Sequence, residues 1–107
     1  MMLRPALIAI WIAVSATAGY ADDGDVLKGL AYAKSTCAGC HAILASQADS
    51  PVAAAPPFEA IANTRGMTET ALAVWFRTPH ATMPNLIIQG EDVANVIAYI
   101  MSLRGKT

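Results

Sequence analysis

The segment Cys37-Ala38-Gly39-Cys40-His41 constrains this chain of 107 residues more than any other feature. The spacing C-x-x-C-H is typical of covalent attachment of a c-type haem. Two thiols at this spacing can each bond to one vinyl group of a haem, and the next residue offers an imidazole nitrogen to the iron. The segment therefore predicts a haem held by Cys37 and Cys40, with His41 as an iron ligand.

Two other kinds of site also use a C-x-x-C pair. In a thiol-disulfide oxidoreductase, a thiolate of lowered pKa does the chemistry, and this alternative stays open for Cys37 and Cys40. In a structural zinc site the pair supplies two of four ligands. The chain contains only two cysteines and two histidines, so a zinc site would have to use all four residues. The count therefore argues against zinc.

Residues 1–21 have the pattern of a secretory signal peptide. Arg4 precedes an uncharged apolar run that ends near Val14, and small residues at Ala18 and Ala21 offer two cleavage points. The apolar run is shorter than the roughly 20 residues of a membrane-spanning helix. We therefore expect export to the periplasm, cleavage after Ala18 or Ala21, and a mature domain of residues 22–107. A retained membrane anchor is the alternative.

Cleavage would change the charge and size of the protein. Arg4 is the only charged residue of the leader, so the formal net charge of −1 becomes about −2 in the mature chain. The remaining Lys and Arg residues are scattered, which gives no basic patch for nucleic acid. A mature domain of this size has a small hydrophobic core and often needs a disulfide, a metal or another cross-link to be stable. A covalently bound haem would meet that need.

The mature chain predicts three main helices, and no segment shows sustained strand alternation. The first begins after Asp25 and leads into Cys37, the second runs from Thr68-Glu69 to before Pro79, and the last runs from about Glu91 to Leu103. Residues 42–57 contain three prolines and read as a loop. A short helix is expected from Phe58 to Asn63.

Apolar residues at helical spacing mark the face that each main helix buries. The predicted buried positions are Val26, Leu27, Leu30 and Ala33 in the first helix, Leu72, Trp75 and Phe76 in the second, and Val93, Val96, Ile97 and Ile100 in the last.

The second axial ligand of the iron largely decides the function. A filled position favours electron transfer, whereas an open one permits small-molecule binding or peroxide chemistry. The candidates are Met67, Met83, Met101 and His80. Met83 is favoured because it lies in an irregular loop before Pro84, where a methionine has no periodic packing role. Met101 lies in the last predicted helix, where methionine usually fills packing gaps. His80 stays open as an alternative.

Taken together, these features resemble the class I c-type cytochromes in their short bacterial monohaem form. The resemblance covers essentially the whole mature chain. It rests on the C-x-x-C-H segment, Ala55-Pro56-Pro57-Phe58, Met83-Pro84 and Ile97-Ala98-Tyr99-Ile100. It implies a small all-α cytochrome c fold, with three main helices, a short helix and loops around one covalent haem c. The first and last helices of this family cross closely, which here would place Gly29 against Tyr99.

The resemblance also implies roles around the haem. In this family a proline carbonyl after the motif accepts the imidazole N–H of the proximal histidine, and Pro56 matches that position, with Pro57 as the alternative. Such a bond fixes the ring and raises the basicity of the ligand. From its position in the chain, and not from the resemblance, Trp75 is expected to donate its indole N–H within the pocket. The expected pocket comprises Pro56, Phe58, Leu72, Trp75, Phe76 and Ile97.

The implied function is that of an exported, monomeric single-haem electron carrier with His41 and Met83 as axial ligands. Its expected partners are redox proteins, such as a dehydrogenase, an oxidase or another cytochrome, with no nucleic acid and no stable membrane insertion. Two alternatives remain. One is a haem enzyme or gas sensor with a labile sixth ligand, and the other is a haem-free thiol-disulfide oxidoreductase that uses Cys37 and Cys40.

Overall fold

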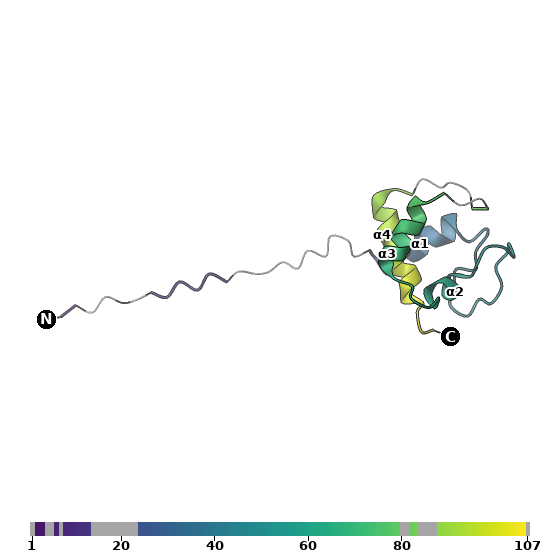
Figure 1. Ribbon diagram of the computed structural model, residues 1–107. Helices are drawn as coiled ribbons and strands as arrows, with labels where there is room; N and C mark the ends of the chain where they lie inside the picture. The colour runs from purple at the N-terminus through teal and green to yellow at the C-terminus, as the bar shows by residue number, and fades with distance from the viewer. Residues whose placement is uncertain are drawn as a thin grey trace.

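The computed structural model describes residues 2, 3, 6, 8–13, 24–79, 82, 83 and 88–106. Within these residues the chain forms four helices and no strand. They are α1 (Val26–Thr36), α2 (Phe58–Ala62), α3 (Glu69–Arg77) and α4 (Gly90–Ser102) (Figure 1). The all-α prediction is confirmed, and each helix begins and ends within about one residue of its expected position.

Side-chain caps explain where two of these helices begin. A carboxylate oxygen of Asp25 accepts a hydrogen bond from the backbone N–H of Lys28 at 3.0 Å, and Thr68 Oγ1 accepts one from Ala71 at 3.0 Å. Each cap satisfies an N–H that the first helical turn leaves without a partner. Asp22 and Asp23, the acidic residues just before Gly24 in the sequence, lie outside the described residues.

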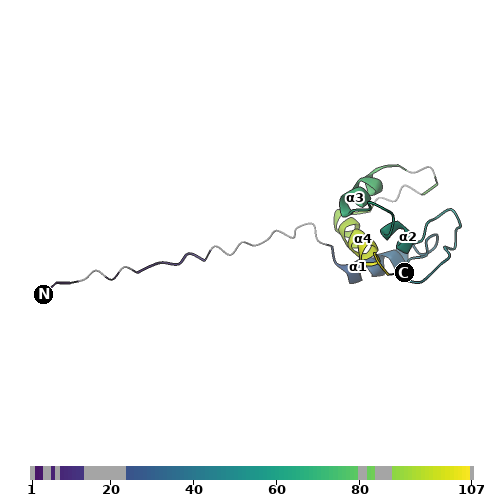
Figure 2. The same cartoon turned by 60° about the horizontal axis from the view of Figure 1, so that its bottom comes forward.

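The last helix, α4, is the common partner of the other three helices. Its crossing with α1 is very close, and the two helices lie against each other in both views (Figures 1 and 2). A Cβ atom on Gly29 would collide with the backbone carbonyl of Asn95 and would lie 2.8 Å from Cβ of Tyr99. The predicted contact between Gly29 and the Tyr99 region is therefore present, and glycine is what permits it.

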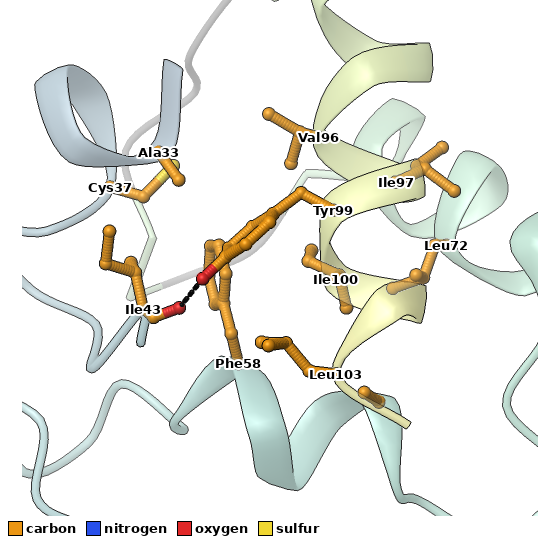
Figure 3. Close-up of a cluster of buried hydrophobic side chains, with 11 residues drawn as sticks. Ala33, Cys37, Ile43, Phe58, Leu72, Val96, Ile97, Tyr99, Ile100 and Leu103 are labelled. Atoms are coloured by element: carbon orange, nitrogen blue, oxygen red, sulfur yellow. Dashed lines mark hydrogen bonds between the residues drawn. The ribbon is translucent and has the colours of Figure 1, made fainter. Parts of the chain in front are cut away.

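The hydrophobic core collects side chains from all four helices and from the segment after the haem motif (Figure 3). Its buried members are Ala33, Cys37, Ile43, Phe58, Ala62, Leu72, Val96, Ile97, Tyr99, Ile100 and Leu103. The apolar stripe predicted for α4 is confirmed, because three of its residues are buried and Val93 is half-buried against the core.

The stripe predicted for α1 is wrong at its N-terminal end. Leu27 is 76% exposed and Val26 is 41% exposed. The buried face is centred on Gly29 and Ala33, which contact α4. At 100° per residue, Leu27 lies about 200° around the helix from Gly29 and so points away from that contact.

The described residues before position 14 extend away from the helices (Figure 1). Their large apolar side chains are at least 78% exposed and comprise Met2, Leu3, Ile8, Ile10, Trp11 and Ile12. Among the described residues, the helices are all too short or too polar to cross a membrane. The helical body therefore builds its core without this N-terminal segment.

Candidate functional site

The C-x-x-C-H segment begins where α1 ends. The backbone N–H of Cys37 donates to Ala33 at 2.8 Å, which continues the helical hydrogen bonding. The carbonyl of Cys37 then accepts from the N–H groups of Cys40 at 3.2 Å and His41 at 2.9 Å. One tight turn of backbone thus holds all three functional residues at the end of a helix that is itself fixed against α4.

The two cysteines lie in different surroundings. Cys37 is buried in the core, Cys40 is exposed, and both are free thiols. Burial raises the pKa of the Cys37 thiol to about 11. Thiol-disulfide chemistry needs a thiolate of lowered pKa, so the surroundings of Cys37 disfavour that alternative. A thioether has no ionisable proton and suits a buried apolar position.

The His41 ring is fixed by the loop that follows it. Its Nδ1 lies 2.6 Å from the carbonyl oxygen of Pro56. Because a carbonyl can only accept, the proton resides on Nδ1 and the lone pair on Nε2 is left for a metal. Pro57 does not compete, since its carbonyl accepts from Ile61 in α2. The hydrogen bond expected for Pro56 is therefore present, and the Phe58 ring packs 5.3 Å from the His41 ring between centroids.

Three further hydrogen bonds place the Pro56 loop against the motif. The N–H of Val52 donates to the carbonyl of Cys40 at 3.1 Å, and the N–H of Phe58 donates to Ala42 at 2.8 Å. The N–H of Ala42 donates to Ser50 Oγ at 2.9 Å. Sequence reasoning did not identify Ser50, because a serine in an irregular loop shows its partner only after the chain has folded.

The residues expected to line the pocket fall into two groups. Phe58, Leu72 and Ile97 are buried together in the core, and Phe76 is half-buried against it. Trp75 is 56% exposed. The buried side of α3 is formed by Leu72 and Phe76. At 100° per residue, Trp75 lies about 60° around the helix from Leu72, in the direction away from Phe76. Contact of these side chains with a haem stays a prediction.

The structure describes three of the four candidates for the second axial position, Met67, Met83 and Met101. Met67 and Met101 both pack against the core, which gives each a structural role. Met83 is half-buried in the connection between α3 and α4. His80 and Pro84 lie outside the described residues. Among the residues described, no group of three or more His, Cys, Asp or Glu residues is placed so that it could hold a metal ion.

Comparison with known proteins identifies the family. No protein-family model and no solved structure matches the chain. A cytochrome c-552 from Bradyrhizobium diazoefficiens is 31% identical over 97 residues, which cover 91% of this chain and 92% of the relative. The chain belongs to the class I c-type cytochromes. This cytochrome is an electron-transfer protein and not an enzyme, and its cofactor is covalently bound haem c.

The residues present in this cytochrome fit such a haem. Cys37 and Cys40 supply two thiols at the attachment spacing, and neither is engaged in a disulfide. His41 supplies an imidazole whose Nδ1 is already bound, so that Nε2 is the nitrogen available to iron. The donor set is therefore complete on the proximal side.

Proposed function

We propose that this cytochrome is an exported single-haem electron carrier in which His41 and Met83 are the axial ligands of the iron. The observation that carries the proposal is the hydrogen bond between His41 Nδ1 and Pro56, since it prepares the imidazole as a ligand directly beside the cysteine pair. When bound, haem c supplies the one-electron exchange between ferrous and ferric iron.

The chain's own residues perform three tasks in this proposal. Cys37 and Cys40 hold the cofactor, and Pro56 keeps the His41 ring in one orientation. The buried side chains of Phe58, Leu72 and Ile97 exclude water. A neutral, polarisable Met83 thioether favours the ferrous state and raises the reduction potential relative to a second imidazole. Ligands retained in both oxidation states limit the rearrangement that accompanies each electron.

We further propose that residues 1–21 are an export signal and that the mature carrier works as a periplasmic monomer. The exposed apolar side chains before residue 14 support this proposal, because the folded domain gives them no partner surface. The partners are redox proteins that donate and accept single electrons. Encounters of this kind use small contact areas, which a domain of this size can supply.

The sulfur-to-iron charge-transfer band of the ferric protein, in the far red, tests the assignment of Met83. We expect the band in the wild type and its loss in Met83→Leu, because leucine preserves volume but has no sulfur. Met67→Leu and Met101→Leu are matched controls and should keep the band. A wild type without the band at neutral pH contradicts the assignment. A band lost in either control moves the ligand to that methionine.

A further inference from the structure

We propose that Ser50 is a positioning residue for His41: its hydroxyl holds the peptide group that follows His41 and thereby sets the strength of the His41–Pro56 hydrogen bond. The inference rests on the proposed function, in which His41 is an iron ligand. Ser50 itself touches neither the cysteines nor the imidazole ring through any hydrogen bond among the described residues. Its effect passes through the backbone of Ala42.

The geometry begins at the peptide bond between His41 and Ala42. The N–H of that peptide is the one that donates to Ser50 Oγ at 2.9 Å. On the other side of Ala42, its carbonyl accepts from the N–H of Phe58 at 2.8 Å. Ala42 is completely buried. Two peptide groups in succession after His41 are thus fixed to one loop, the first of them by a side chain.

The same loop carries the carbonyl that binds the His41 ring. Pro56 lies between Ser50 and Phe58 in the sequence. The hydrogen bonds of Ser50 and Phe58 to Ala42 therefore fix the loop on both sides of Pro56, whose carbonyl binds the His41 ring. That bond is short, at 2.6 Å between Nδ1 and the Pro56 oxygen. A small displacement of the loop relative to His41 would lengthen it and weaken it steeply.

Loss of the Ser50 hydroxyl would leave the N–H of Ala42 buried without a partner. A buried unpaired donor carries its full desolvation penalty, and the chain can relieve it only by moving the peptide or the loop. Either movement weakens the hydrogen bond to Nδ1 and lowers the basicity of the imidazole. A less basic ligand stabilises ferric iron less, so the reduction potential should rise.

The test compares Ser50→Thr with Ser50→Val, because these side chains share a shape and differ in the hydroxyl. In the haem-loaded protein we expect the threonine variant to match the wild type. In the valine variant the Ala42 amide should exchange its hydrogen about tenfold faster. The His41 ring N–H resonance should shift in the NMR spectrum, and the reduction potential should become more positive. Ser50→Ala, which adds no volume, supplies the same comparison if the valine variant does not accumulate.

Gln47 provides a control in the same loop. Its Oε1 accepts from the N–H groups of Ile43 and Leu44 at 3.2 and 3.3 Å, beyond the peptide next to His41. Gln47→Met should speed amide exchange at Ile43 and Leu44 without moving the His41 resonance or the potential. The inference is overturned if the valine and threonine variants agree in the His41 resonance and in the reduction potential, or if Gln47→Met reproduces the valine result. A wild type whose His41 resonances show no influence of iron would instead refute the proposed ligation.

Discussion

Tyr99 connects the last helix to the segment that carries His41. Its buried hydroxyl donates to the carbonyl of Ile43 at 2.5 Å, two residues after His41 (Figure 3). Its ring lies 6.4 Å from that of Phe58, which in turn packs on the His41 ring. One phenol thus contributes both a hydrogen bond and an aromatic contact to the surroundings of His41.

The Tyr99 hydroxyl should make stability depend on pH in the alkaline range. Burial raises the pKa of Tyr99 above its ordinary value of 10. The pKa of Tyr99 is higher in the folded protein than in the unfolded chain, so the neutral phenol stabilises the fold. This contribution is fully present below about pH 10 and is lost as the pH rises through the pKa of the folded protein. At pH 7 we expect Tyr99→Phe to lower the free energy of unfolding by about 1 kcal/mol. The deficit should shrink above pH 10.

Denaturant unfolding followed by circular dichroism at pH 7 and above pH 10 measures this difference. Tyr32→Phe is a matched control, since this ring also packs against the core and its hydroxyl makes no hydrogen bond within the described part of the chain. A Tyr99→Phe deficit that stays constant across the alkaline range would show that the hydroxyl is not the titrating group.

At the scale of elements, the contact between α1 and α4 is built from backbone as much as from side chains. The N–H of Asp25 donates to Oδ1 of the buried Asn95 at 2.8 Å, which ties the start of α1 to α4. Gly24 and Gly29 lie against the backbone carbonyls of Ala94 and Asn95. Because the C-x-x-C-H segment continues directly from α1, this contact also positions Cys37, Cys40 and His41.

A side chain at Gly29 should separate the two helices. Alanine normally favours a helix interior over glycine by roughly 1 kcal/mol, yet here its Cβ would overlap backbone atoms that cannot rotate away. We expect Gly29→Ala to lower the free energy of unfolding by about 1–3 kcal/mol, the usual cost of overpacking. Chemical denaturation measures the change.

Gly90→Ala is the control for this substitution. A Cβ atom at Gly90, in the first turn of α4, would meet no other atom within 4 Å. The control should leave stability unchanged or raise it slightly. Equal losses of stability in both variants would contradict the role assigned to the crossing, because only Gly29 lies against the backbone of α4.

The comparison of α1 with the loop of residues 42–57 shows which contacts could be predicted from the sequence. Local signals sufficed for the helix caps at Asp25 and Thr68, because a cap and its partner lie three residues apart. Pro56 could be assigned only through a family resemblance, since its partner lies fifteen residues away. The role of Asn95 could not be predicted, because the N–H that donates to its side chain belongs to Asp25, 70 residues earlier in the sequence. Tertiary packing alone brings these two residues together.

At the scale of the whole molecule, α4 and the residues after it contact each of the other three helices or the segments between them. Asn95 and Tyr99 of this helix lie against Gly29 of α1, while the chain after α4 returns to the segment between α2 and α3. There the N–H of Gly105 donates to Asn63 Oδ1 at 2.8 Å, and Arg104 donates to the carbonyl of Met67 at 2.8 Å. These contacts join the four helices to one another, whereas the large apolar side chains described before residue 14 are exposed.

The proposed export signal predicts the mass of the mature protein. An apolar segment that packs on nothing is costly in water, and in an export signal it is removed after translocation. Mass spectrometry of the purified protein should give the chain from Asp22, or from Gly19 if cleavage follows Ala18, plus one haem. Cys37→Ser/Cys40→Ser is the control and should show the same cleavage without the haem adduct. A wild-type mass that retains residues 1–21 would favour a membrane anchor, whereas an unmodified, disulfide-bonded mass would refute haem attachment at Cys37 and Cys40.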